Sequence, residues 1–174
     1  MRQKLVLNGL MMVLTVSFGS CSKNEPTFSN TPIIGFRSIA KYTIGTNVAR
    51  TQRDSVVISI TFKDGNGDLG EDVRDTTRLS RTFANQPWGN YQIRTFKFVS
   101  GKFEEVSIAG NSKLFFQQTS TKRGPLEGVL DFTQKFPYQS NIKSVPVKFQ
   151  VRLRDRELNE SNIIETDTVS VPII

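Results

Sequence analysis

Hydrophobic and polar residues alternate with a period of two along most of this chain. The alternation is clearest over residues 56–63, 126–132, 147–154 and 168–173. Such alternation predicts half-buried β-strands, with one face in a core and the other in water. Further strands are expected over 34–44, 91–99, 102–108 and 113–118, and Ser100-Gly101 is a tight hairpin signal. No segment keeps a 3.6-residue apolar period over three turns, so no long amphipathic helix is expected.

Seven or eight strands separated by turn signals predict an all-β fold, specifically an antiparallel β-sandwich, with an Ig-like topology as the first choice. Residues 33–174 would form this single domain. The polar stretch at 21–32, which contains Pro26 and ends at Pro32, is typical of a tether. The long polar connection over 69–90 is of a length that often carries function or lacks order.

The N-terminal residues have the order of a secretion signal. Arg2 and Lys4 precede an apolar run, and Gly19-Ser20-Cys21 follows it. A helix of about 14 residues rises only about 21 Å, short of the roughly 30 Å hydrocarbon core, which disfavours a permanent transmembrane helix.

The stretch Phe18-Gly19-Ser20-Cys21 resembles the bacterial lipobox, although Phe18 replaces the usual leucine. The resemblance implies that residues 1–20 are a lipoprotein signal peptide and that Cys21 carries a covalent lipid. Two or more acyl chains would anchor the domain stably in a membrane, whereas one chain would not. We therefore expect an outer-membrane lipoprotein that faces the periplasm or the cell surface. The alternative is an unmodified cysteine after an ordinary signal peptide.

The composition excludes several functional classes. Cys21 is the single cysteine and there is no histidine, so an intrachain disulfide, a Ser-His-Asp triad and a His-ligated zinc site are all ruled out. Any metal site must use oxygen ligands, which suit Ca²⁺ or Mg²⁺. No phosphate-binding Gly-rich loop of the Walker or Rossmann type occurs. We expect a protein that is not an enzyme, with a carboxylate-dependent hydrolase as a minor third class.

The chain carries a formal net charge of +7. Its basic residues are scattered, whereas nucleic-acid binding requires a clustered patch with stacking aromatic residues, so no nucleic acid is expected as a partner. Most of these residues are expected on solvated strand faces, although attraction to an anionic outer surface is an alternative. Arg152, Arg154 and Arg156 share one strand face, where they would either keep that face soluble or grip an anionic ligand.

The strongest chemical signal is an acidic loop after the strand over 56–63. Its oxygen-bearing side chains are Asp64, Asn66, Asp68 and Asp72. Alternate spacing allows one short loop to place several oxygens around a cation of the size of Ca²⁺, while the intervening glycines permit the bends. The loop is not an EF-hand, because Leu69 replaces the glycine expected at the sixth position and the flanks are strands. The alternative is a hairpin turn in which Asp and Asn side chains cap their own backbone.

Two motifs of this chain resemble those of Bacteroidetes-type exported lipoproteins of unknown function. The first is Phe62-Lys63-Asp64-Gly65-Asn66-Gly67-Asp68-Leu69-Gly70, and the second is Asp155-Arg156-Glu157-Leu158-Asn159-Glu160-Ser161-Asn162-Ile163-Ile164-Glu165-Thr166. Arg123-Gly124-Pro125-Leu126-Glu127-Gly128 is also similar to segments of such chains. The resemblance implies a β-sandwich lipoprotein and supplies no activity. Asp155 would either complete an oxygen cage around the calcium or simply cap its own turn.

Trp88 and Tyr91 are candidates for sugar binding, because exposed aromatic rings stack on sugars. The alternative is that Trp88 plugs one end of the sandwich. The leading hypothesis is therefore a lipid-anchored binding or interaction module of the cell envelope, with one structural calcium ion and an unknown protein or glycan ligand. The runner-up is a carbohydrate-binding component of a surface glycan-uptake assembly.

Overall fold

The computed structural model describes residues 27–45, 52–72, 81–107, 115–116, 124–139 and 141–173. For residues 71–72 and 115–116 it describes the backbone and not the side chains. Cys21, the expected signal peptide and the side chain of Asp72 therefore lie outside the described part of the chain.

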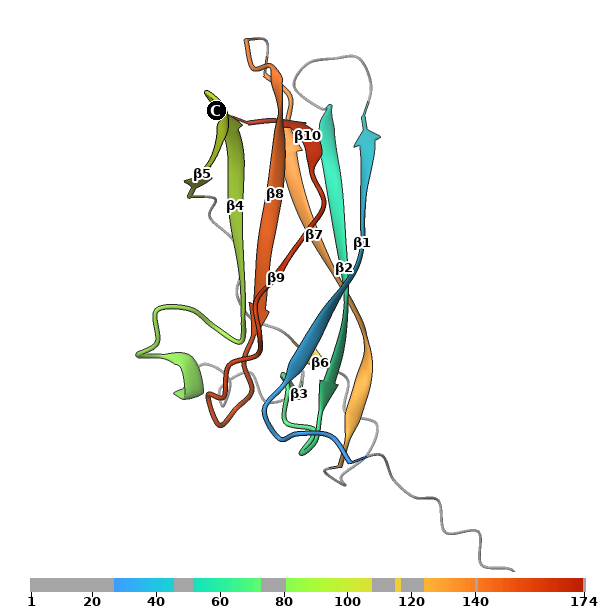
Figure 1. Ribbon diagram of the computed structural model, residues 1–174, viewed down its shortest axis with the longest axis vertical. Coiled ribbons are helices and arrows are strands. Elements are labelled where there is room, and N and C mark those ends of the chain that lie inside the picture. Colours follow the sequence, from blue (N-terminus) through green and yellow to red (C-terminus); the bar gives the residue numbers. More distant parts are fainter. Residues whose placement is uncertain are drawn as a thin grey trace, which may run out of the picture.

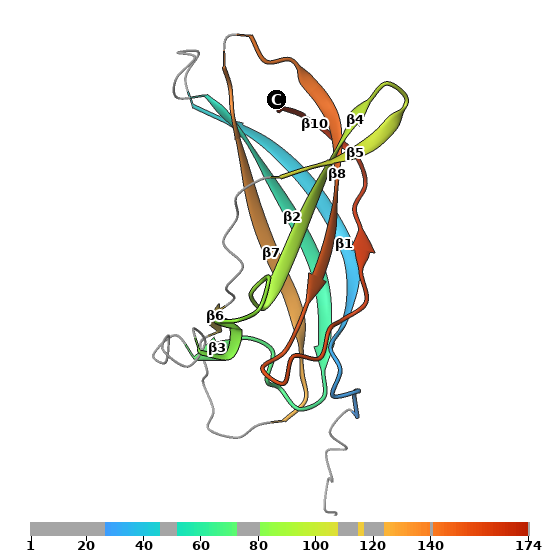
Figure 2. The same cartoon turned by 90° about the vertical axis from the view of Figure 1, so that its left-hand side faces the viewer.

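The described strands form two main antiparallel sheets that pack face to face (Figures 1 and 2). The first sheet has the order β1-β2-β7, with β1 at Ile33–Ile44, β2 at Arg53–Asp64 and β7 at Leu126–Pro137. The second has the order β10-β8-β4-β5, with β4 at Tyr91–Val99, β5 at Lys102–Val106, β8 at Ser144–Leu153 and β10 at Val169–Pro172. The short strand β9 (Ile164–Glu165) pairs with β8, and β3 (Glu71–Asp72) pairs in parallel with β6 (Phe115–Phe116).

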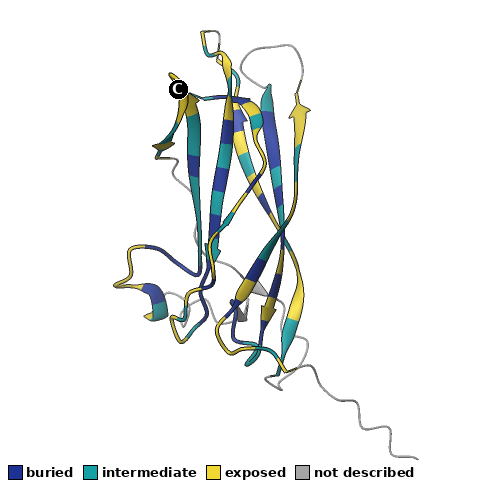
Figure 3. Cartoon of the chain, in the orientation of Figure 1, coloured by how far each residue is buried: buried dark blue, intermediate teal, exposed yellow. Residues whose placement is uncertain are grey.

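The period-two pattern builds the core between these sheets. In β2 the side chains of Val56, Ile58 and Ile60 are fully buried, and in β8 so is Phe149. Aromatic rings pack against each other across the two sheets, and the ring centroids of Tyr91 and Phe132 lie 4.9 Å apart. Figure 3 shows the resulting alternation of buried and exposed positions along the strands. Burial of the apolar faces is the main stabilising contribution, since each large side chain removed from water is worth about 1.5–3 kcal/mol.

The expected all-β sandwich is confirmed, whereas the Ig-like topology stays a prediction. The strand over 91–99 has the expected bounds, and the hairpin turn falls at Ser100 and Gly101, which both have positive φ. The strand over 102–108 ends at Val106, and of the strand over 113–118 only Phe115–Phe116 is described. Within the long polar connection, residues 81–83 form a helical turn. Among the described residues, no helix has the length and apolar character needed to cross a membrane.

Candidate functional site

The acidic loop lies where β2 ends, at the end of the sandwich where β1 begins (Figure 1). Two glycines bring other chain segments into backbone contact with it. A Cβ on Gly65 would lie 2.3 Å from the carbonyl oxygen of Phe28, and a Cβ on Gly67 would lie 2.2 Å from that of Gly124. Gly65 also donates its N–H to the Ser29 carbonyl at 2.8 Å. The loop therefore packs between the segment that precedes β1 and the segment that precedes β7.

Asp64 and Asp68 are buried in this loop, with 0% and 2% of their surface exposed. Asp64 Oδ2 accepts a hydrogen bond from the Leu69 N–H at 2.9 Å. Asp64 Oδ1, Asn66 Oδ1 and Asp68 Oδ1 are also buried, and within the described chain no donor completes a hydrogen bond to any of them. Buried polar groups are nearly always paired, because leaving one unpaired costs about 1–3 kcal/mol and more for a charge.

The electrostatics of the loop oppose ionisation of these carboxylates. Burial, with the charge of Asp155, raises the pKa of Asp64 above its ordinary value, against the lowering effect of the backbone N–H groups of Leu69, Asp68 and Asn66. Burial, followed by the charges of Asp155 and Asp64, raises the pKa of Asp68 from 3.8 to about 6, while Arg156 acts in the opposite direction. The loop thus concentrates negative charge where solvation is poor.

The second motif reaches the same place from the end of β8. Asp155 is fully buried, and its two oxygens accept hydrogen bonds from the Asn159 N–H and from Asn159 Nδ2, both at 2.8 Å. Arg156 donates from Nε to the Asp68 carbonyl at 2.9 Å and from Nη2 to the Gly67 carbonyl at 3.4 Å. Asp155 therefore caps its own turn while adding charge beside Asp64 and Asp68.

The structure brings four of the five predicted metal-site residues to one end of the sandwich, and the fifth, Asp72, has no described side chain. Among the described residues, no three His, Cys, Asp or Glu side chains form a ready metal-binding group. The loop instead offers two carboxylates and an amide oxygen, while the third carboxylate, Asp155, is occupied by Asn159. This arrangement can bind a hard cation through side-chain oxygens, and Asp155 contributes chiefly its charge.

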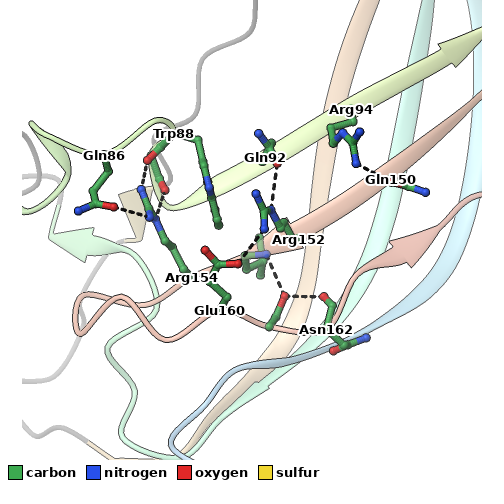
Figure 4. A network of polar contacts seen from close by, with 12 residues as sticks. Gln86, Trp88, Gln92, Arg94, Gln150, Arg152, Arg154, Glu160 and Asn162 are labelled. Carbon is green, nitrogen blue, oxygen red and sulfur yellow. Dashed lines mark hydrogen bonds and ion pairs between the residues drawn. The ribbon is translucent and has the colours of Figure 1, made fainter. Parts of the chain in front are cut away.

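The two predicted sugar-binding residues, Trp88 and Tyr91, do not form an exposed aromatic surface. Trp88 is 8% exposed, and the guanidinium groups of Arg152 and Arg154 lie 4.4 and 4.1 Å from its ring centroid. Figure 4 shows these groups on opposite sides of the ring. Tyr91 packs against the core and Phe132, and burial raises the pKa of its phenol. These contacts favour a structural role for both residues.

Arg154 differs from the expectation that it keeps a strand face soluble. Only 3% of it is exposed, because the segment over 81–90 covers it. Its guanidinium group donates to the carbonyls of Trp88 and Gly89 and to Gln86 Oε1. Burial lowers the pKa of this arginine below its usual range. Arg154 thus fastens the loop before β4 onto the end of β8.

A polar groove that sequence reasoning missed lies on the outer face of β4 and β8 (Figure 4). Its volume is about 190 Å³, and its lining consists of Gln92, Arg94, Gln150, Val151, Arg152 and Ile163. The four polar residues form a square because the register places Gln92 opposite Arg152 and Arg94 opposite Gln150. Each arginine donates to the glutamine opposite it, at 2.9 Å for Arg152 and 3.2 Å for Arg94.

Three cations of this face, Arg94, Lys148 and Arg152, have carboxylate partners. Arg94 makes a bidentate pair with Glu105 of β5, Arg152 pairs with Glu160 at 2.7 Å, and Lys148 pairs with Glu165 at 2.8 Å. The hydrogen bonds from Arg94 hold the pKa of Glu105 below its usual range, and Lys148 does the same for Glu165. The face is therefore rich in donors and acceptors and balanced in charge.

Aromatic rings continue this face toward the tip of the β4–β5 hairpin. Phe98 is 41% exposed and lies edge-on to Phe103 at a centroid distance of 5.2 Å. Arg94 lies over Phe96, and Lys148 lies over Phe103. At the other side of the groove Ile163 is 54% exposed. Apolar surface thus lines the groove at Ile163, and aromatic rings continue the same face beyond the groove toward the hairpin tip.

Comparison with known proteins adds no assignment, because no family model, curated protein or solved structure matches this chain.

Proposed function

We propose that this chain is a non-catalytic, lipid-anchored β-sandwich of the outer membrane that binds a neutral, hydroxyl-rich ligand such as a glycan. The observation that carries the proposal is the charge-balanced groove of β4 and β8 with its square of guanidinium and amide groups. The chemistry of this groove supports the ligand class, and the N-terminal sequence supports the anchor.

The pairing of charges selects against an anionic ligand. An anion that approached Arg94 or Arg152 would have to displace Glu105 or Glu160 and would leave that carboxylate unpaired. A hydroxyl group both donates and accepts, so it fits a surface on which amides, guanidinium groups and carboxylates alternate. The exposed apolar surface of Ile163 offers contact to the C–H face of a sugar ring.

The proposed sugar site is the groove of β4 and β8, and it does not include the predicted residues Trp88 and Tyr91. Trp88 lies between two guanidinium groups, and Tyr91 is partly buried and packs against Phe132, so neither ring forms an exposed platform for a sugar. An aromatic contribution would come only from a longer ligand that extends beyond the groove to the exposed ring of Phe98 near the hairpin tip. A cavity smaller than the roughly 300–1,000 Å³ of most small-molecule sites suits one or two sugar units of a longer chain.

The groove lies toward the same end of the sandwich as the tether, because Gln92 is near the start of β4 and Arg152 is near the end of β8. The length of the tether therefore decides how far the groove stands from the membrane. The described chain enters β1 at the end of the sandwich that carries the acidic loop, whereas the β4–β5 hairpin tip lies at the opposite end (Figures 1 and 2). Attachment at Cys21 would leave about a dozen residues before β1, enough to lift this end off the membrane. The outer face of β4 and β8 would then rise away from the bilayer.

Binding is tested with the purified chain on a glycan array, followed by calorimetry with each hit. The double variant Gln92→Ala/Gln150→Ala removes both amides and is expected to weaken binding by about tenfold or more, since each hydrogen bond contributes about 0.5–1.5 kcal/mol. Gln134→Ala, in β7 of the other sheet, is the matched control and should bind as the unmodified chain does. Equal binding by all three proteins, or binding of anions alone, refutes the groove.

The anchor is tested by labelling cells with a palmitate probe. We expect label on the unmodified chain and none after Cys21→Ser. Label that persists in the variant, or a mature protein that retains residues 1–20, contradicts the lipid attachment.

A further inference from the structure

The acidic loop carries an inference that goes beyond ligand binding. Asp64, Asn66 and Asp68 each bury one side-chain oxygen that completes no hydrogen bond within the described chain, although backbone N–H groups of the loop approach the Asp64 carboxyl. Asp64 and Asp68 are almost completely buried, so solvent does not compensate for the missing hydrogen bonds. Three such oxygens within five residues of one loop call for a partner other than the protein itself.

The surrounding charges indicate the sign of that partner. Three buried carboxylates, those of Asp64, Asp68 and Asp155, interact electrostatically in this loop. Arg156 is the cation that acts on Asp68, and its guanidinium group donates to the Asp68 and Gly67 carbonyls. The buried carboxylates outnumber this cation by three to one, and the charge of Glu157 adds to the excess, so a divalent cation would offset most of the negative charge of the cluster.

The chemistry of the ligands selects the ion. Carboxylate and amide oxygens are hard ligands, and the described site contains no sulfur or imidazole, which soft transition metals prefer. Ca²⁺ tolerates irregular geometry and takes six to eight oxygens, with water completing the shell, whereas Mg²⁺ demands a near-ideal octahedron. An irregular loop with three side-chain oxygens therefore favours Ca²⁺.

We propose that Asp64, Asn66 and Asp68 bind one Ca²⁺ ion, with Asp155 as a nearby negative charge, and that this ion locks the end of the sandwich. The lock follows from the segments that meet there. Gly65 contacts Phe28 and Ser29 at the entry to β1, and Gly67 contacts Gly124 before β7. An ion that rigidifies residues 64–68 therefore also holds the point at which the tether joins the domain.

The test is calorimetric titration of Ca²⁺ into the chelator-stripped full chain in detergent, together with thermal unfolding with and without the ion. We expect one Ca²⁺ per chain and a melting temperature that rises with free Ca²⁺, because the ion binds the folded state. Asp64→Asn and Asp68→Asn should each weaken binding by about tenfold or more, since ligand charge sets calcium affinity. Asp167→Asn makes the same change at an exposed residue outside the loop and should change nothing.

Asn66→Ala keeps both carboxylates and alters a partly exposed side chain, so it tests the site even where a carboxylate variant fails to fold. It should retain one ion at reduced affinity. The proposal is overturned by an unmodified chain that gives no heat and no thermal shift with Ca²⁺. It is equally overturned by wild-type affinity in Asn66→Ala and the carboxylate variants, or by an ion that Mg²⁺ displaces at equal concentration. None of these results depends on whether the groove binds glycans.

Discussion

Replacement of Asp68 by asparagine should stabilise the calcium-free chain at neutral pH. The pKa of Asp68 rises from 3.8 to about 6 in the folded state, because the carboxyl is buried beside Asp155 and Asp64. The other charged groups that act on it are Arg156, which lowers this pKa, and Glu157, which raises it. A difference of about two pKa units at about 1.4 kcal/mol each corresponds to about 3 kcal/mol.

The sign follows from proton binding. Between about pH 4 and pH 6 the folded state keeps the Asp68 proton while the unfolded state loses it, so stability falls as the pH rises through this window. Above about pH 6 the full penalty is present, and below about pH 4 it is absent. Asparagine carries no charge, so Asp68→Asn should match the unmodified chain at about pH 4 and exceed it by about 3 kcal/mol at pH 7.

The assay is urea unfolding in chelator, followed by circular dichroism, at several pH values from about 4 to 8. A gain of 3 kcal/mol corresponds to about 6–12 °C in melting temperature for a chain of this size. In saturating Ca²⁺ this advantage should shrink by about 1.4 kcal/mol or more, because the variant binds the ion at least tenfold more weakly. An Asp68→Asn protein that is no more stable than the unmodified chain at pH 7 in chelator would refute the reasoning.

Two further predictions concern stability away from the groove. Gly67→Ala should destabilise the chain by about 2 kcal/mol or more, because φ is +65° and the new Cβ would lie 2.2 Å from the Gly124 carbonyl oxygen. Gly124→Ala is the control, because its Cβ would meet no atom within 4 Å. The denaturant midpoints of the two variants are compared with that of the unmodified chain. Arg154→Met should lower the free energy of unfolding in urea by about 3 kcal/mol, because buried carbonyls such as that of Trp88 would lose their hydrogen-bond donor. The control Arg37→Met, on the exposed surface of β1, should lower it by less than about 0.5 kcal/mol. Similar losses in both members of either pair would contradict these assignments.

The strands were predictable because each has one face in the core and one in water. In β2 the buried residues Val56, Ile58 and Ile60 fall on one parity, and local sequence contains this information completely. The same rule fails at Arg154, whose parity indicates the outer face of β8. That position is buried because Phe83 and Trp88, some 65 to 70 residues earlier, fold over it, and no local pattern reports such a contact.

The candidate sites divide in the same way. Alternate spacing of Asp64, Asn66 and Asp68 identified the acidic loop, but the burial of their oxygens depends on segments 28–29 and 124, which approach through the two glycines. The polar groove had no sequence signal, because it exists only through the register that sets Gln92 opposite Arg152. Pairing between strands some 60 residues apart is a property of the whole fold.

The second motif gains a physical explanation from its hydrogen bonds, which bind it to three separate parts of the domain. Arg156 binds the acidic loop through the Asp68 carbonyl. Asn162 accepts from the Ile34 N–H at 2.9 Å and donates to the Ile34 carbonyl at 2.8 Å, in β1 of the other sheet. Ser161 Oγ and Thr166 Oγ1 accept from backbone N–H groups of β8. Since these polar side chains replace strand pairing where β8 meets β1, the segment joins the two sheets at the end that holds the acidic loop. A cation that orders residues 64–68 would therefore stabilise this junction through Arg156, which is why the two motifs form one structural unit although about 90 residues separate them.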